Sequence, residues 1–226
     1  MIDFGRRAED PEMLDEGVPA DEAVRSLADL RFVNRWLGGR RSLVSAVGPF
    51  LRERARPRLL DVGCGSADLP ALLVERSGGK LLAVGVDIKL LHLREAPPGV
   101  ARVVADVRRL PFAPGSFDVV TASLFLHHFN GPEVAETLRT LYALARRALV
   151  VNDLERSIVP YTFARLAFPW VLRSAVSVSD GLLSIRRAFT PRELRAAFEE
   201  AGIPHVRIRS GFAYRLVAVA ERPADK

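Results

Sequence analysis

The sequence has a single cysteine and no apolar stretch long enough to cross a membrane. Cys64 alone cannot form an intramolecular disulfide, and its isolation is typical of a protein in a reducing compartment. Arg, Pro or His interrupts the longer apolar runs before the roughly 18 residues that a membrane span needs. The N-terminus, which includes Arg6 and Arg7, has no apolar core of a secretory signal. We therefore expect a cytoplasmic protein without a membrane span.

Lysine is also scarce, although the chain is basic. Three of its 33 basic residues are lysines, its formal net charge is +6, and its arginines are spread along the sequence. Nucleic-acid-binding domains more often concentrate such charge on one element, interleaved with aromatic side chains. The pattern is instead typical of solvated arginines on helix surfaces, so we expect no nucleic-acid partner. Apolar residues make up 49% and charged residues 27%, as in a globular domain with a substantial core.

Between residues 58 and 154, short apolar runs alternate with helical patterns, the order typical of β-α-β units around a parallel sheet. Strands are predicted at 58–62, 81–87, 102–106, 117–122 and 148–152. Thr190, Pro191 and Glu193 combine an N-cap, a proline at the first helical position and a glutamate at the third, which predicts a helix start. Two later apolar runs, 206–209 and 215–220, predict a closing antiparallel pair.

Two segments lie outside this alternation. Residues 1–56 contain helical patterns and are expected to form an N-terminal helical cap, ahead of a sheet domain at 57–226. Within that domain, residues 157–189 carry bulky apolar side chains such as Tyr161 and Trp170, and predict a helical insert after the fifth strand. Both segments could cover a ligand pocket; ordinary packing helices are the alternative.

The segment after the first predicted strand indicates a cofactor site. Gly63 and Gly65 follow the strand at once, where the chain must turn sharply and a ligand can approach backbone that has no Cβ. The next helix then points free N–H groups into the crevice at the carboxyl end of the sheet. The second strand ends in Asp87, from where a carboxylate can accept hydrogen bonds from ribose hydroxyls. Together these features predict a nucleoside-type cofactor.

Two acids discriminate between such cofactors. Asp68 stands where the dinucleotide fingerprint has its third glycine, and Asp61 lies two residues before the first glycine. An acid beside the turn would repel a pyrophosphate and attract a cation. S-adenosylmethionine carries a sulfonium and an ammonium group and no phosphate, so the sequence favours it over NAD.

The segment Asp61-Val62-Gly63-Cys64-Gly65-Ser66-Ala67 resembles the first motif, D-x-G-x-G-x-G, of class I S-adenosylmethionine-dependent methyltransferases. It departs from that motif at Ala67, where glycine is commonest. The resemblance extends over about residues 55–155. It implies an α/β fold with a Rossmann-like, seven-stranded, mostly parallel sheet whose C-terminal strand is antiparallel. It also implies S-adenosyl-L-methionine as the cofactor.

The same resemblance assigns roles to residues along the chain. Asp87 would bind the ribose, Asp106 the exocyclic amine of adenine and Val107 the adenine ring, whereas Ser123 and Leu124 belong to the segment under the methionine moiety. The cofactor-binding residues that it implies are Asp61, Gly63, Cys64, Gly65, Asp87, Ile88, Asp106, Val107, Ser123 and Leu124.

A second, looser resemblance concerns the flanking segments. Residues 3–8, 13–15, 34–41 and 184–190 resemble parts of bacterial methyltransferases of polyketide-type secondary metabolism. This resemblance implies a small hydroxylated aromatic or lipidic acceptor, which the apolar stretch at 161–170 could accommodate.

Methyl transfer to a hydroxyl acceptor also needs a base, and histidine is best suited to that role near neutral pH. His127 and His128 follow the fourth predicted strand, but as neighbours they cannot both face the acceptor; we favour His128, with a structural histidine as the alternative for each. Asp153 could orient an acceptor, or it could stabilise a turn or cap backbone groups. Ser123 and Leu124 stand where a metal-assisted mechanism needs acids, so no metal ion is expected.

The sequence thus favours O-methylation of a small hydroxylated aromatic or lipidic molecule by a monomer or homodimer. C- or N-methylation of a quinone or another small molecule remains open, because a ring carbon needs a similar deprotonation. Methylation of RNA or protein is a third possibility, although the N-P-P-Y/F-type motif of base methylators is absent after the fourth strand. A module that binds S-adenosylmethionine without catalysis is a fourth.

Overall fold

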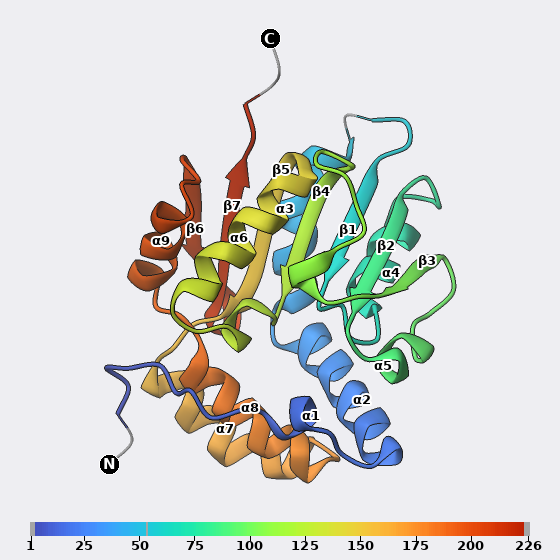
Figure 1. Ribbon diagram of the computed structural model, residues 1–226. Coiled ribbons are helices and arrows are strands. Elements are labelled where there is room, and N and C mark those ends of the chain that lie inside the picture. Colours follow the sequence, from blue (N-terminus) through green and yellow to red (C-terminus); the bar gives the residue numbers. More distant parts are fainter. Residues whose placement is uncertain (1–2, 53, 224–226) are drawn as a thin grey trace.

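A single seven-stranded sheet organises the chain, as the computed structural model shows for residues 3–52 and 54–223 (Figure 1). Its strand order is β3-β2-β1-β4-β5-β7-β6, with β1 to β5 mutually parallel and β7 antiparallel to both of its neighbours. The predicted fold class is therefore confirmed. The strands are β1 (Arg58–Val62), β2 (Leu82–Asp87), β3 (Val100–Val104), β4 (Phe117–Ser123), β5 (Ala145–Leu154), β6 (Val206–Ser210) and β7 (Arg215–Glu221).

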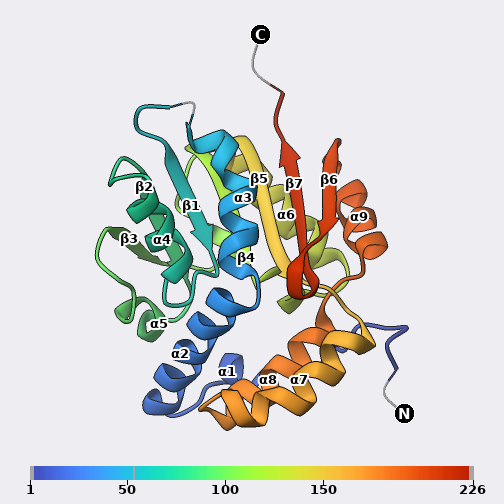
Figure 2. The ribbon, with the colours of Figure 1, turned by 180° about the vertical axis from the view of Figure 1, so that it is seen from behind.

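Helices cover both faces of the sheet, and further helices lie beyond the carboxyl ends of its parallel strands (Figures 1 and 2). The α-helices are α1 (Met13–Glu16), α2 (Ala20–Trp36), α3 (Gly39–Arg52), α4 (Asp68–Arg76), α5 (Leu90–Arg94), α6 (Pro132–Leu144), α7 (Ile158–Val171), α8 (Ala175–Arg187) and α9 (Pro191–Glu200). The 3-10 helices are η1 (Val107–Arg109), η2 (Leu126–His128) and η3 (Phe212–Tyr214). Helices α6 and α9 pack on one face, and α3 and α4 on the other. None of the helices described here is long and apolar enough to span a bilayer.

The third strand differs from its prediction at 102–106, because the structure begins it at Val100 and ends it at Val104. Ala105 and Asp106 leave the sheet at its carboxyl end. The Asp106 carboxylate then caps η1 by accepting a hydrogen bond from the Arg108 backbone N–H at 2.9 Å. An acid that was expected to close the strand therefore begins a turn.

The helices of the N-terminal segment pack in two different places. Helix α3 packs on the sheet, where Leu43, Val47 and Phe50 are buried against residues of β1, β4 and β5. Helices α1 and α2 instead lie with α7 and α8 beyond the carboxyl ends of the parallel strands (Figure 2). The expected cap at residues 1–56 and insert at 157–189 thus supply the four helices at this end of the sheet. Residues 1, 2 and 53 of that cap, and 224–226 of the sheet domain, lie outside the described residues.

Candidate functional site

A cavity of about 680 Å³ lies between the sheet and the four covering helices. Its volume is typical of a pocket for a cofactor or small molecule. The structure brings together on its lining every candidate residue that the sequence analysis named. These are Asp61, Gly63, Cys64, Gly65, Asp87, Ile88, Asp106, Val107, Ser123, Leu124, His127 and His128.

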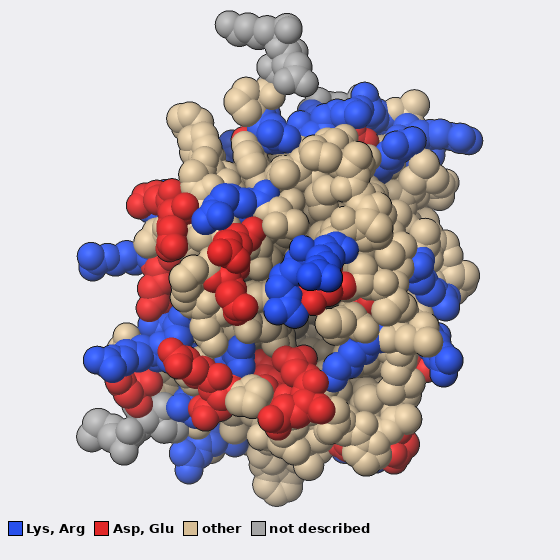
Figure 3. Space-filling model, in the orientation of Figure 1, with Lys and Arg blue, Asp and Glu red and all other residues tan. Residues whose placement is uncertain are grey.

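The cavity is acidic although the chain is basic. Ten of its lining residues are Asp or Glu, against one Lys and two Arg. The ten acids are Glu12, Asp15, Asp29, Asp61, Asp68, Asp87, Asp106, Glu133, Glu155 and Asp180. On the face seen in Figure 3, acidic side chains gather below the hollow at its centre. Such a lining favours a cationic ligand and opposes a polyphosphate.

Asp61 is the most deeply placed of these acids. Its side chain is buried at the end of β1 and accepts a hydrogen bond of 2.6 Å from the Thr121 hydroxyl on β4. Burial raises the pKa of Asp61 to about 7; the hydrogen bond from Thr121 opposes the rise, and the nearby charges of Asp68 and Asp87 add to it. A cation beside this carboxylate would relieve the cost of its buried charge.

Asp87 organises the glycine turn. Its two oxygens accept hydrogen bonds from the backbone N–H groups of Gly65 and Lys89, both at 2.9 Å. A ring nitrogen of the buried His92 lies 3.3 Å from one of these oxygens, a contact that no motif in the sequence indicated. Ile88, 61% exposed, stands beside this acid on the lining. The carboxylate is thereby fixed in place and keeps lone pairs for a ligand hydroxyl.

The close packing of Phe125 and the positive φ angles explain why small residues occupy the glycine turn. Gly63 (φ +66°) lies under the ring of Phe125, and a Cβ on it would come within 2.1 Å of that ring. Ala67 has φ +52°, which explains why glycine is commonest there in the family motif. Burial raises the pKa of the Cys64 thiol, which disfavours the nucleophilic thiolate.

The remaining candidates lie along the carboxyl ends of β3 and β4. Asp106 pairs with the Arg108 guanidinium at 2.7 Å, beside the buried Val107. Ser123 has a buried hydroxyl without a hydrogen-bond partner among the described residues. Leu124 follows it with φ +51°, a strained value for a leucine. An orphaned hydroxyl beside a strained residue is typical of a ligand site.

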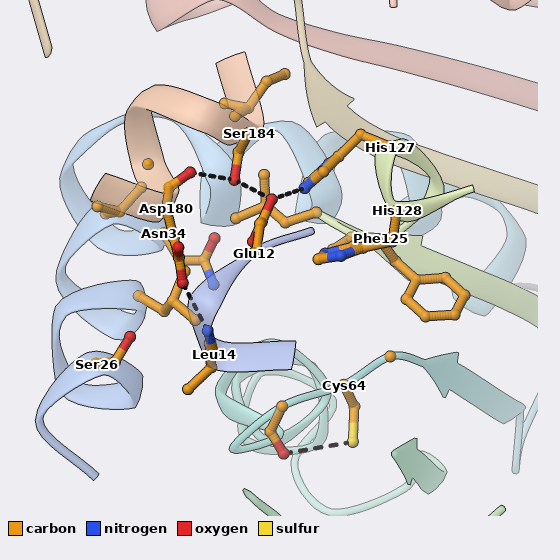
Figure 4. A pocket seen from close by; sticks show the side chains of 18 of the residues that line it. Glu12, Leu14, Ser26, Asn34, Cys64, Phe125, His127, His128, Asp180 and Ser184 are labelled. Atoms are coloured by element: carbon orange, nitrogen blue, oxygen red, sulfur yellow. Dashed lines mark hydrogen bonds and ion pairs between the residues drawn. The ribbon is translucent and has the colours of Figure 1, made fainter. Parts of the chain in front are cut away.

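His127 is held between two carboxylates. Its Nδ1 lies 2.6 Å from Asp153 Oδ1. Its Nε2 lies 3.4 Å from Glu12 Oε1, a contact that Figure 4 shows. Burial alone would lower the pKa of His127, but the charge and hydrogen bond of Asp153, with those of Glu12, raise it to about 10. The His127 charge in turn outweighs burial and holds the pKa of Asp153 at about 2. At neutral pH His127 is therefore an imidazolium and has no lone pair to accept a proton.

His128 is placed differently. It is partly exposed, lines the cavity and brings its Nδ1 to 2.7 Å from Asp15 Oδ2. If Nδ1 donates its proton to this carboxylate, Nε2 keeps a free lone pair. Of the two candidate bases, this geometry favours His128. It also gives Asp153 the role of a partner to His127.

Each histidine faces one carboxylate from residues 3–17, which we call the N-terminal strap: Glu12 faces His127 (Figure 4), and Asp15 faces His128. The backbone N–H groups of Met13 and Leu14 donate to the two oxygens of Asp180 on α8, both at 2.9 Å. Arg7 donates to the carbonyl oxygens of His127 and Phe129, at 3.0 and 2.9 Å. The sequence analysis missed this contribution, because the acids of the strap follow no motif or periodicity.

Glu12, His127 and His128 also form a group with the composition of a metal site. Their ligand atoms lie within 4.8 Å of one another. The proton on His127 Nε2, facing Glu12, already supplies the positive charge between these groups. The expectation of a metal-free enzyme stays a prediction.

The comparisons with known proteins agree with this geometry. Residues 59–148 match the family described as a methyltransferase domain. The ubiquinone/menaquinone biosynthesis C-methyltransferase UbiE of Rhizobium meliloti is 32% identical over 186 residues, covering 73% of this chain and 70% of that protein. The demethylmenaquinone methyltransferase of Renibacterium salmoninarum is 29% identical over 130 residues, 56% of this chain. The chain spans about half the length of the latter protein, 52%.

Solved structures share the fold at low sequence identity. The plantazolicin methyltransferase BpumL, in complex with a desmethylPZN analogue and SAH, superposes with a TM-score of 0.67 at 12% identity. That match covers 89% of this chain and 97% of BpumL. The magnesium protoporphyrin IX methyltransferase ChlM of Synechocystis, with bound SAH, gives a TM-score of 0.58 at 18% identity over 85% and 87% of the chains.

The raised pKa of Asp61 predicts a pH-dependent gain in stability for Asp61→Asn. The folded protein keeps the proton up to about pH 7, whereas the unfolded chain releases it near pH 4, so the stability of the wild type falls as pH rises between these values. Above pH 7 the buried charge costs up to about 4 kcal/mol, at about 1.4 kcal/mol per pKa unit. Urea unfolding should show Asp61→Asn more stable than the wild type at pH 8, by more than at pH 5.

Asp106→Asn is the matched control. The hydrogen bonds from Arg108 lower the pKa of Asp106, so this substitution should bring no gain at pH 8. An Asp61→Asn effect that is equal at both pH values would contradict the assignment of a buried, costly charge.

Proposed function

This chain belongs to the class I S-adenosylmethionine-dependent methyltransferases, and we propose that it transfers the methyl group of S-adenosylmethionine to a small, lipophilic acceptor with an aromatic hydroxyl. One observation carries the proposal: a single cavity runs from the glycine turn, where Asp61, Asp68 and Asp87 line it, to the covering helices, which line it with apolar side chains as well as with Asp29 and Asp180. The lining at the turn suits a cationic adenosyl donor, and the apolar side chains suit an apolar ring or chain.

The residues at the acidic end fit S-adenosylmethionine. Asp61 and Asp68 supply negative charge near the turn, Asp87 presents its carboxylate for ribose hydroxyls, and the orphaned Ser123 hydroxyl offers a donor and an acceptor. Asp106 shares its oxygens with Arg108 and can still accept from an adenine amine. When bound, the cofactor would supply an electrophilic methyl carbon. The protein's part is to exclude water and to align the acceptor with that carbon.

The acceptor end is built by the covering helices. Leu30 and Val33 of α2 lie on its lining with Phe163 and Phe168 of α7 and Ile185 of α8. These side chains offer no hydrogen bonds, so they select for apolar shape. We infer that α1, α2, α7 and α8 together form the substrate cover, in line with the predicted cap and insert.

We infer that His128 is the general base. His128 lines the same cavity as the glycine turn, and its Nε2 could take the proton of a phenol bound there while Asp15 holds Nδ1. Asp15 is then a positioning residue, acting through His128. His127 fixes the turn at η2 as part of a charged row with Glu12 and Asp153.

Methylation of a ring carbon is the second candidate. It is favoured by the similarity to UbiE and to the demethylmenaquinone methyltransferases, whose names specify quinone substrates. A deprotonated quinol can attack through oxygen or through a ring carbon, so His128 would serve either reaction.

A screen with a labelled methyl donor tests the proposal. Purified protein should methylate at least one member of a set of alkylphenols, pyrones and reduced quinones, and NMR of the product should show an O–CH3 or a C–CH3 group. Transfer to RNA or protein in the same screen, with no small acceptor modified, would contradict the proposal.

The cofactor site predicts that Asp87→Ala weakens S-adenosylmethionine binding about 100-fold, through loss of the bidentate hydroxyl contact and of the turn that it holds. Gly63→Val should abolish binding, because its side chain would collide with Phe125. Calorimetry measures both, and Glu199→Ala, an exposed acid on α9, is the control. Unchanged affinity in both cavity variants would refute the assignment.

The proposed role of His128 as general base predicts that His128→Ala lowers kcat about 100-fold or more, while the affinity for S-adenosylmethionine stays within twofold. Asp15→Asn should lower kcat less, and Asp15→Glu should recover part of it, because a glutamate can still orient the ring. His205→Ala is the matched control on the loop before β6. Full activity of His128→Ala would show that the acceptor needs no base here.

A further inference from the structure

Helix α7 is apolar on its outer side as well as on its buried side. Leu166 is 69% exposed and Trp170 is 88% exposed, whereas Ala164 and Phe168 face the core. The helix contains no acidic residue and one basic residue, Arg165. Surface helices normally turn a polar face to water, so an outer face of this kind marks an interaction surface.

This outer face continues into the mouth of the cavity. Val159 and Phe163 of α7, and Phe212 and Tyr214 of η3, line the cavity and are also exposed to solvent. Glu155, just before α7, donates its backbone N–H to the Tyr214 carbonyl, so the two segments are adjacent. We call the combined surface the apolar rim. It consists of Val159, Phe163, Leu166, Trp170, Phe212 and Tyr214.

The position of the rim in the fold leaves it uncovered. Figure 2 shows α7 on the outside of the covering helices, with the turn between β6 and β7 just above it. The end of α2 adds to this side, because Gly38 lies against Phe212 and the exposed Trp36 precedes it. Trp36 in turn contacts the Arg35 guanidinium at 5.2 Å. The end of α2 therefore adds one aromatic and one basic side chain next to the segment that contacts Phe212.

We propose that the apolar rim docks on an anionic lipid surface, so that the acceptor enters the cavity directly from the bilayer. The inference rests on the proposed function in one respect: the acceptor is lipophilic. Trp, Tyr and Phe mixed with arginine are the residues that favour the boundary between headgroups and acyl chains. Arg165 and Arg173, both exposed, add attraction to anionic headgroups.

Charge argues against a second copy of the chain as the occupant. A twofold dimer through α7 would bring the same surface of two copies together. Arg165 would then meet a second copy of α7, which has no acidic residue to pair with it. An anionic bilayer supplies the complementary charge that a second copy lacks.

Tryptophan fluorescence gives a direct test, because the chain has two tryptophans, Trp36 and Trp170. In Trp36→Phe, Trp170 is the remaining reporter. Vesicles of equal parts phosphatidylglycerol and phosphatidylcholine should shift its emission to the blue, and brominated lipid should quench it. Vesicles of phosphatidylcholine alone should have a weaker effect. An emission spectrum that anionic vesicles leave unchanged would overturn the proposal.

Co-sedimentation with the same vesicles separates the apolar and charged contributions. Leu166→Ser/Trp170→Ser should lower binding at least tenfold, and Arg165→Gln/Arg173→Gln should lower it about fivefold per arginine. Leu82→Ser is the matched control, because Leu82 is an exposed leucine at the opposite end of the sheet. Binding equal to the wild type in both double variants would overturn the proposal, as would a dimer in solution that Leu166→Ser/Trp170→Ser dissociates.

Different results would contradict the docking surface and the proposed function. Leu166 and Trp170 do not line the cavity. Their double variant should therefore methylate a short-chain, water-soluble phenol like the wild type and lose rate only with acceptors embedded in vesicles. Vesicle binding without methylation of any phenol or quinol would count against the proposed function, whereas phenol methylation without vesicle binding would overturn the docking surface.

Discussion

The collection of carboxylates in a poorly solvated cavity is the constraint on which the rest of the site depends. Buried acids are costly, and burial raises the pKa of Asp61, Asp68 and Asp180. The chain nevertheless places ten acids there while its net charge is +6, so the basic residues lie mainly elsewhere. A bound cation would lower the cost of the buried charge at acids, such as Asp61, that pair with no basic side chain among the described contacts. A donor with a sulfonium and an ammonium group would supply such a cation.

Where the protein itself neutralises these acids, it also fixes the turn at η2 that carries both histidines. His127 lies between Asp153 at the end of β5 and Glu12 on the strap, and so links segments far apart in the sequence. Arg187 of α8 donates to the carbonyl oxygens of His127 and His128, at 3.1 and 2.7 Å. The backbone of η2 is thereby held from three sides. This frame positions His128, whose own side chain contacts the Asp15 carboxylate and stacks on the His127 ring at 4.4 Å between centroids.

The sequence was informative where a local rule applies. The glycine turn, the acid ending β2 and the Thr190 capping box depend on nearby residues, and the structure has them where they were predicted. The third strand was placed two residues too late, because Asp106 satisfies a turn and not the sheet. Glu12, Asp15 and His92 were missed as site residues. Their roles come from contacts over 5 to 115 residues, which no spacing rule describes.

The two ends of the cavity are encoded in different parts of the chain. The match to the methyltransferase domain family covers residues 59–148, which contain the glycine turn, Asp87, Asp106 and both histidines. The strap and helices α2, α7 and α8 lie outside that range, yet they line the rest of the cavity. The residues expected to hold the donor therefore lie within the family match, whereas the wall that would contact an acceptor is built by segments outside it.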